Sequence, residues 1–144
     1  MKALLQRVNQ ASVSITGEVV SSIGPGLLVF LSVDHHDAYS KADRLLHKVL
    51  HYRLFADVDD KMNFNVLQSE GSLLVVSQFT LSAETSRGLR PNFSKAANRE
   101  LGQKLYQYFI NQASRYINVS CGHFGAHMQV NLTNDGPVTV LLTV

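Results

Sequence analysis

The sequence predicts an α+β fold in which a mostly antiparallel sheet is accompanied by two helices. Two observations support this prediction. Short apolar, β-branched runs separated by glycine and proline turns dominate the first third and the end of the chain. Two interior segments instead space their apolar residues three and four positions apart, as an amphipathic helix does. No internal repeat or low-complexity segment is present, and we expect one domain spanning residues 1–144.

The first third of the chain has the pattern of paired strands. Residues 2–8 and 12–15 carry Leu, Val and Ile in partial alternation, and residues 16–18 supply a turn into a further strand. Gly24-Pro25-Gly26 marks a tight turn before an apolar run that ends at Val33. We therefore expect a hairpin followed by a buried strand.

Helical spacing begins near Asp37 and returns after Ser94. The apolar positions between residues 38 and 50 form one stripe, which predicts the first helix. Ser94 is the predicted N-cap of the second helix. His47 and His51 lie one turn apart on the first helix, and with no carboxylate motif beside them we interpret them as surface or boundary residues.

Strands return between the helices and at the end of the chain. A Leu- and Val-rich strand at residues 73–76 is predicted to continue through the polar segment 77–81. At the end, residues 128–133 alternate and 138–144 are β-rich, and Asn-Asp-Gly-Pro at 134–137 separates them as a turn, because proline removes a ladder donor. By itself this Gly-Pro bond is expected to be trans.

Composition bounds the class of protein. Of 144 residues 45% are hydrophobic, and 13 Lys and Arg against 11 Asp and Glu leave a net charge of +2, which excludes a histone-like or polybasic protein. The single cysteine, Cys121, excludes an intrachain disulfide framework and suggests a reducing compartment. No apolar run approaches the ~20 residues of a membrane helix, and no signal peptide is recognisable. We expect a soluble cytoplasmic domain without a membrane partner.

A search for familiar catalytic motifs finds no G-x-S-x-G elbow, P-loop or G-x-G-x-x-G. Cys121, His123 and His127 form a C-x-H-x3-H cluster that a zinc site could use, although chance spacing is the simpler interpretation. Two polar segments in apolar surroundings remain, 77–81 and 134–139. Amides and hydroxyls at a strand end can hold a carbonyl or a developing oxyanion; the alternative is a strand that becomes half-exposed.

These two segments together resemble the motif pair of the D-aminoacyl-tRNA deacylases. Both occur in the right order and at the right distance, in a chain of the right length. Further matching segments extend the resemblance over nearly the whole chain: residues 5–8, 23–28, 41–45, 61–63, 88–91 and 124–126. The family pattern has acidic residues where His123 and His127 stand here.

The resemblance implies a barrel-like sheet and a homodimer that hydrolyses the ester between a D-amino acid, or glycine, and the 3′ end of tRNA. In the family, a cis Gly-Pro peptide reaches into the partner's pocket. Carried over, Gly136 and Pro137 form this selector, which leaves room for a hydrogen but not for an L side chain. Arg7, Asn134 and Thr139 would support its conformation. No cofactor, metal site or DNA partner is implied.

The same resemblance implies that Ser77, Gln78, Phe79 and Thr80 line the aminoacyl pocket, with backbone N–H groups near Phe79 directed at the ester carbonyl. Thr80 carries the motif's one nucleophile-like hydroxyl, but no base stands beside it in the sequence, so we do not predict an acyl-enzyme. The family view is that the 2′-OH of the terminal ribose assists cleavage. That view fits a site without His, Cys or carboxylate.

The small net charge predicts modest, salt-sensitive binding of tRNA. Arg87, Arg90 and Lys95 are candidates for contacts with the acceptor stem, or else solvated loop charges. Two other functions stay open from the sequence. One is a module that binds the tRNA acceptor end without catalysis, and the other is a metal hydrolase built on the Cys/His cluster.

Overall fold

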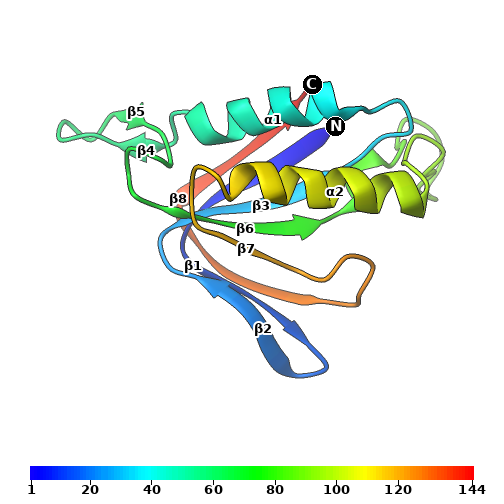
Figure 1. The fold of residues 1–144 in the computed structure, drawn as a ribbon, viewed down its shortest axis with the longest axis horizontal. Helices are drawn as coiled ribbons and strands as arrows, with labels where there is room; N and C mark the ends of the chain where they lie inside the picture. Colours follow the sequence, from blue (N-terminus) through cyan, green and yellow to red (C-terminus); the bar gives the residue numbers. More distant parts are fainter.

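A computed structural model describes residues 1–144 as a nearly closed, mixed β-sheet barrel with two helices along one side (Figure 1). The α+β class and the two main helices are confirmed. None of the helices has the length and apolar character needed to cross a membrane. In chain order the elements are β1 (Lys2–Ile15), β2 (Glu18–Ile23), β3 (Gly26–Ser32), α1 (Tyr39–His51), β4 (Phe55–Ala56), β5 (Met62–Phe64), β6 (Ser72–Ser77), the 3-10 turn η1 (Phe79–Ser82), α2 (Arg99–Ala113), β7 (Val119–Cys121) and β8 (Gln129–Thr143).

The sheet is mixed, which corrects the expectation of a mostly antiparallel sheet. β1 pairs antiparallel with β2, β3 and β8. β6, however, runs parallel to β3, and β7 runs parallel to β6. The reason is that α1 lies between β3 and β6 in the chain and α2 lies between β6 and β7. A helical crossover returns the chain to the same end of the sheet, so the two strands that it joins become parallel.

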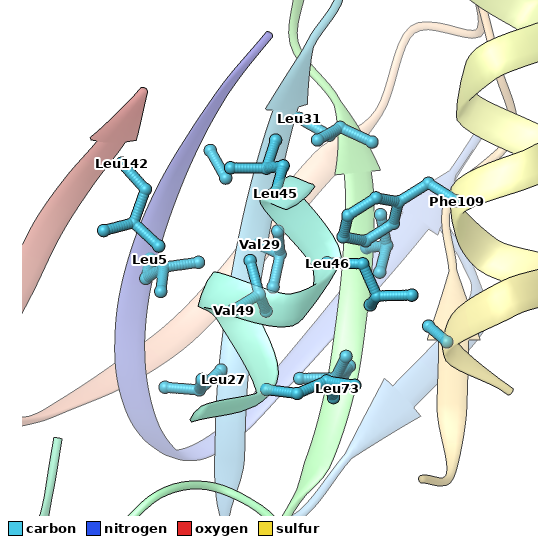
Figure 2. Close-up of a cluster of buried hydrophobic side chains, with 14 of the residues drawn as sticks. Leu5, Leu27, Val29, Leu31, Leu45, Leu46, Val49, Leu73, Phe109 and Leu142 are labelled. Carbon is cyan, nitrogen blue, oxygen red and sulfur yellow. The ribbon is translucent and has the colours of Figure 1, made fainter. Parts of the chain in front are cut away.

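Both faces of β3 and β6 are buried, and this explains why these strands are almost entirely apolar. On one face, alternate residues of both strands pack against α1 and α2, as Figure 2 shows for Leu27, Val29 and Leu73 against Val49 and Phe109. The intervening residues form a second, smaller core on the other face, made of Leu28, Leu74 and Val76 together with Val8, Ala11, Val13 and Ile23.

The second core is covered by the sheet itself, which curls over. The β1–β2 hairpin and the first half of β8 extend away from the helices (Figure 1). The far edge approaches this hairpin, where the hydroxyl of Ser120 in β7 donates to the carbonyl of Ser22 in β2 at 3.1 Å. These contacts bring the barrel close to closure.

The second helix begins later than predicted. α2 starts at Arg99, and the Asn98 side chain, not that of Ser94, accepts the capping hydrogen bond from the first turn at 2.9 Å. Ser94 lies instead in a turn that the Ala96 amide closes on the Phe93 carbonyl at 2.9 Å, and the residues after this turn pair with those that follow β3. The amide of Ala97, for example, donates to the carbonyl of Val33 at 2.9 Å.

A buried ion pair anchors the start of the chain beside α1. The Met1 amine lies 2.7 Å from the Asp37 carboxylate, neither group is exposed, and the Lys41 ammonium lies 3.0 Å from the same carboxylate. Burial raises the pKa of Asp37, but hydrogen bonds from the Met1 amine, the Asp34 amide and Lys41 outweigh it. The pKa of Asp37 is therefore held below its usual value.

Asp37→Asn is expected to lower the free energy of unfolding by about 3–5 kcal/mol at neutral pH, because it leaves a buried ammonium without its counter-ion. Since folding lowers the pKa, the carboxylate stabilises the fold above its unfolded-state pKa of about 3.9. This stabilisation is lost as the pH falls through the folded-state value. Urea denaturation near neutral pH and at about pH 3 should show the difference between variant and wild type shrinking in acid. A pH-independent difference, or an equal loss in the exposed-site control Asp59→Asn, would contradict this account.

Candidate functional site

A pocket of about 470 Å³ opens where β6 ends. Three predicted site residues line it, namely Ser77, Gln78 and Phe79, whereas Thr80 is exposed and does not. The opposite walls come from the start of α2 and from the loop between β7 and β8. The pocket thus combines one segment that the sequence singled out with two others distant in the chain.

The predicted strand over residues 73–81 ends early, at Ser77, and a 3-10 turn follows. The amide of Gln78 still donates to the Leu31 carbonyl at 2.8 Å, as a last contact with β3. Within the turn the first hydrogen bond runs from the Leu81 amide to the Gln78 carbonyl, at 3.2 Å. The amides of Phe79 and Thr80 precede this bond, so the turn itself does not use them, as at any helix start.

Buried hydroxyls hold this turn against the end of β3. The side chain of Ser82 is fully buried, where it hydrogen-bonds the hydroxyl of Ser32 and donates to the carboxylate of Asp34. The Phe79 ring, by contrast, is 59% exposed and meets Phe93 edge-on with centroids 5.0 Å apart. A rigid backbone therefore carries an aromatic ring that is open to a ligand.

The facing wall contains residues that sequence reasoning missed. Arg99 and Asn98 line the pocket from the start of α2. The Arg99 guanidinium lies against Gly125, with Nη2 3.4 Å from the position that a Cβ on Gly125 would occupy. Gly125 has φ +75°, a conformation that favours glycine. The resemblance at residues 124–126 pointed to this loop, but no sequence signal pointed to Arg99.

His127 also lines the pocket, which corrects the expectation of a site without histidine. It was missed because the loop reaches the end of β6 only through the parallel pairing of β7 with β6. Tyr106 lies deeper, where its hydroxyl hydrogen-bonds the Val75 and Gly122 carbonyls at 2.8 and 3.2 Å, and burial raises its pKa. No carboxylate lines the pocket, so its charged wall is cationic.

The second predicted segment projects from β8 as a bulge. β8 is a single strand rather than two strands joined by a turn, but its pairing with β1 shifts. Val8 pairs with Asn134 and Gln6 pairs with Thr139, so residues 135–138 lie opposite a single residue of β1. Within this bulge the Gly136–Pro137 peptide bond is cis, and both residues are exposed.

Asn134 closes the bulge with its side chain. Its Oδ1 accepts from the Val138 amide at 3.1 Å, and its Nδ2 donates to the carbonyls of Val138 and Arg7 at 3.0 and 3.1 Å. At the other end, the Thr139 hydroxyl accepts a hydrogen bond from Gln6 at 3.2 Å. The Asn134 side chain thus satisfies both the amide and the carbonyl of Val138 and ties the bulge to β1.

Arg7 braces the tip of the bulge from below. Its Nε donates to the Asp135 carbonyl at 3.1 Å and lies 3.1 Å from the Asp135 carboxylate. Its Nη1 donates to the Leu54 carbonyl at 2.6 Å. One half-buried guanidinium thus ties the bulge to the segment after α1.

The pocket and the bulge do not meet within one chain. No residue from 134 to 139 lines the pocket. Arg7, opposite the bulge, pairs with Leu27 near the start of β3, whereas Gln78 bonds Leu31 near its end. Four residues of strand separate these positions, or about 13 Å at ~3.3 Å per residue.

The three basic candidates differ in their surroundings. Arg87 and Arg90 are exposed in the loop after η1. Lys95 is also exposed but is paired with Glu84. The hydrogen bond from Lys95 lowers the pKa of Glu84 to about 2, and the same bond raises the pKa of Lys95. The two arginines are therefore the free cations of this trio.

Cys121, His123 and His127 are not assembled into a metal site. The structure contains no group of three or more His, Cys, Asp or Glu side chains placed to hold a metal ion. Cys121 is half-buried in β7, whereas both histidines are exposed on the loop that follows.

A family model and individual relatives both match this chain over essentially its whole length. Residues 4–143 match the family described as D-Tyr-tRNA(Tyr) deacylase. Proteins named D-aminoacyl-tRNA deacylase from Haemophilus influenzae (strain 86-028NP) and Mannheimia succiniciproducens are 56% identical to this chain, over 100% of each sequence.

Two solved structures share the fold. One, titled c-Myc DNA Unwinding Element Binding Protein, has a TM-score of 0.96 and 36% identity, covering 100% of this chain and 99% of that one. The other, titled as a probable eukaryotic D-amino acid tRNA deacylase, has a TM-score of 0.87 at 16% identity, covering 98% and 97%. Since the family match and the 56% relatives extend over essentially the whole sequence, the chain belongs to the D-Tyr-tRNA(Tyr) deacylase family.

Proposed function

We propose that this protein is a hydrolase that cleaves the ester between a D-amino acid and the 3′ end of tRNA. The observation that carries the proposal is the pocket at the end of β6, where Phe79, whose amide no hydrogen bond of the turn uses, lies opposite a cationic wall without carboxylates. Such a site suits an ester carbonyl that gains negative charge during hydrolysis. Membership of the family and the names of the 56% relatives support the same activity.

In the proposed reaction, water attacks the ester carbonyl and the acyl–oxygen bond breaks, which releases the free amino acid and the ribose 3′-hydroxyl. The amide of Phe79, the residue of the turn that lines the pocket, would stabilise the oxyanion. The ribose 2′-OH would assist by sharing the proton that passes to the departing 3′-oxygen. His127 is the pocket side chain that could accept a proton from water as a neutral imidazole, whereas the Tyr106 hydroxyl is committed to backbone carbonyls.

We further propose that the active unit is a homodimer in which the Gly136–Pro137 bulge of one subunit enters the pocket of its partner. Two observations support this arrangement: the bulge is exposed but braced, and it lies far from the pocket of its own chain. Backbone carbonyls placed against the substrate Cα would admit a hydrogen and exclude an L side chain. Glycyl-tRNA, which has no side chain, would pass the same filter.

For the tRNA itself, Arg87 and Arg90 are the proposed contacts with acceptor-stem phosphates, because neither is held in an ion pair. Lys95 would have to leave Glu84 to contribute. With a net charge of +2, binding should be modest and should weaken as salt rises. The expected cytoplasmic location follows from the substrate, since charged tRNA is used there.

The test compares D-tyrosyl-tRNA with L-tyrosyl-tRNA as substrates of the purified protein. Cleavage of the D-ester alone supports the proposal, whereas cleavage of neither or of both equally contradicts it. Binding of the acceptor end without acceleration over buffer would favour the binding-module alternative. An unlabelled DNA duplex serves as competitor, and the expected absence of competition would separate this chain from a DNA-binding function.

Thr80→Ala is expected to change kcat/KM for D-tyrosyl-tRNA by less than about fivefold. The Thr80 hydroxyl accepts a hydrogen bond from the Gln78 side chain and does not line the pocket. Losing one exposed neutral hydrogen bond is worth about 1 kcal/mol at most, which is under a factor of ten in rate. Steady-state kinetics measure the change. Complete loss of activity in a folded variant would instead make Thr80 a nucleophile.

A further inference from the structure

Two histidines on α1 lie side by side, outside the proposed active site. His47 and His51 are four residues apart on the helix, which places both side chains on one face, with Cβ atoms about 5–6 Å apart. Both residues are exposed. Their rings are stacked, with centroids 4.3 Å apart and planes inclined by 24°. No residue of α1 lines the pocket.

The hydrogen bonding of His51 determines which of its nitrogens is free. Its Nδ1 lies 2.9 Å from the His47 carbonyl oxygen. Because a carbonyl can only accept, Nδ1 carries the proton, and Nε2 keeps the lone pair that a metal ion requires. The backbone of one histidine therefore orients the ring of the other, much as outer-sphere partners orient metal-binding histidines.

The charges around this end of α1 are mixed, since the exposed Arg44 lies one turn before His47. His51 is the last residue of the helix, where unsatisfied carbonyls give the helix its negative pole. The neighbouring Lys48 ammonium points elsewhere, donating to the Thr143 carbonyl at 3.2 Å. Asp43 lies one turn before His47, on the same face of α1. Its carboxylate accepts a hydrogen bond from Tyr108 at 2.9 Å and adds a negative charge to that face.

We propose that His47 and His51 together bind one divalent transition-metal ion of the Ni²⁺, Cu²⁺ or Zn²⁺ class. Imidazole nitrogens suit these ions, and two nitrogens at ~2.0 Å from one metal lie about 3 Å apart. The centroids of the two rings are already only 4.3 Å apart. Since no third His, Cys, Asp or Glu is grouped with them, water would complete the coordination sphere.

Calorimetric titration of the whole protein with NiCl₂ tests the proposal, since Ni²⁺ does not oxidise the thiol of Cys121 as Cu²⁺ can. We expect one Ni²⁺ per chain and weaker binding to Mn²⁺, in line with the general order of affinities. His47→Gln and His51→Gln should each weaken Ni²⁺ binding by at least about tenfold, because each removes one of the two protein ligands.

The matched controls are His36→Gln and His123→Gln, which remove exposed histidines elsewhere and should leave Ni²⁺ affinity unchanged. His123 matters because it too has a histidine four residues away, but outside a helix. Ni²⁺ should raise the melting temperature of the wild type and of both controls, but not that of the α1 variants. Absence of binding, equal binding by the α1 variants, or loss of binding in His123→Gln would overturn the proposal. None of these outcomes depends on deacylation.

Discussion

Gly136→Ala is expected to lower kcat/KM for D-tyrosyl-tRNA by about 100-fold or more. Gly136 has φ +131°, and a Cβ there would lie 2.7 Å from Val138 Cγ2, 3.0 Å from the Val138 nitrogen and 3.1 Å from Arg7 Nη2. The bulge must therefore shift to accept even a methyl group. A displacement of about 1 Å in a group that positions substrate can cost 10²-fold in rate. Single-turnover deacylation at sub-saturating enzyme, where the rate is proportional to kcat/KM, measures the loss.

The same variant also tests the proposed role of the bulge in chirality. If the bulge excludes L side chains, its displacement should narrow the ratio between D- and L-tyrosyl-tRNA cleavage as well as slow the reaction. Gly24→Ala is the matched control, because a Cβ at Gly24 meets no heavy atom within 4 Å. A folded Gly136→Ala variant with wild-type rate and wild-type selectivity would show that the bulge does not act on the substrate.

Gly26→Ala is expected to destabilise the fold by about 3 kcal/mol or more, at the upper end of the usual cost of overpacking. Gly26 begins β3 and pairs with Ser72 of β6. A Cβ at this position would lie 2.0 Å from the Ser72 carbonyl oxygen and 2.7 Å from its nitrogen. Both are backbone atoms that cannot rotate away, so β3 and β6 would have to separate. Urea denaturation followed by circular dichroism measures the free energy of unfolding.

The control for this prediction lies two residues earlier. Gly24→Ala changes the same turn by the same methyl group but meets no neighbour, so its effect should stay within about 0.5 kcal/mol. If both variants lose the same stability, the effect belongs to the flexibility of the turn and not to the close approach of β3 and β6.

How much of the fold could be predicted is clearest at β3 and α1. The unbroken apolar run that ends at Val33 and the stripe between residues 38 and 50 are local patterns, and both elements form where predicted. Strand direction is not a local property. β6 is parallel to β3 because α1 carries the chain back across the sheet, and that return depends on which faces pack together.

The residues at which helices and strands begin and end were also hard to predict from local patterns. Ser94 has the chemistry of an N-cap, but its segment pairs with residues after β3, and Asn98 caps α2 instead. The strand predicted to reach Leu81 stops at Ser77, since buried contacts of Ser82 with Ser32 and Asp34 hold the following residues in a turn. Competing partners far along the chain decided both boundaries.

The residues of the candidate site also fall into two groups, those that the sequence predicted and those that it missed. Ser77, Gln78 and Phe79 attract attention because polar residues follow a buried strand, and all three line the pocket. Arg99 and His127 carry no comparable signal. They reach the pocket because α2 and β7 follow β6 as successive parts of one crossover, a juxtaposition that spacing along the chain does not contain.

The sequence alone was enough to determine the α+β class, the two amphipathic helices and the two polar segments, because these depend on residue periodicity and on backbone preferences of glycine and proline within a few residues. The tertiary structure decided the mixed direction of the sheet, the cationic wall of the pocket and the distance between pocket and bulge. Those features arise from packing between segments far apart in the chain, where the partner of each residue is selected by the whole fold.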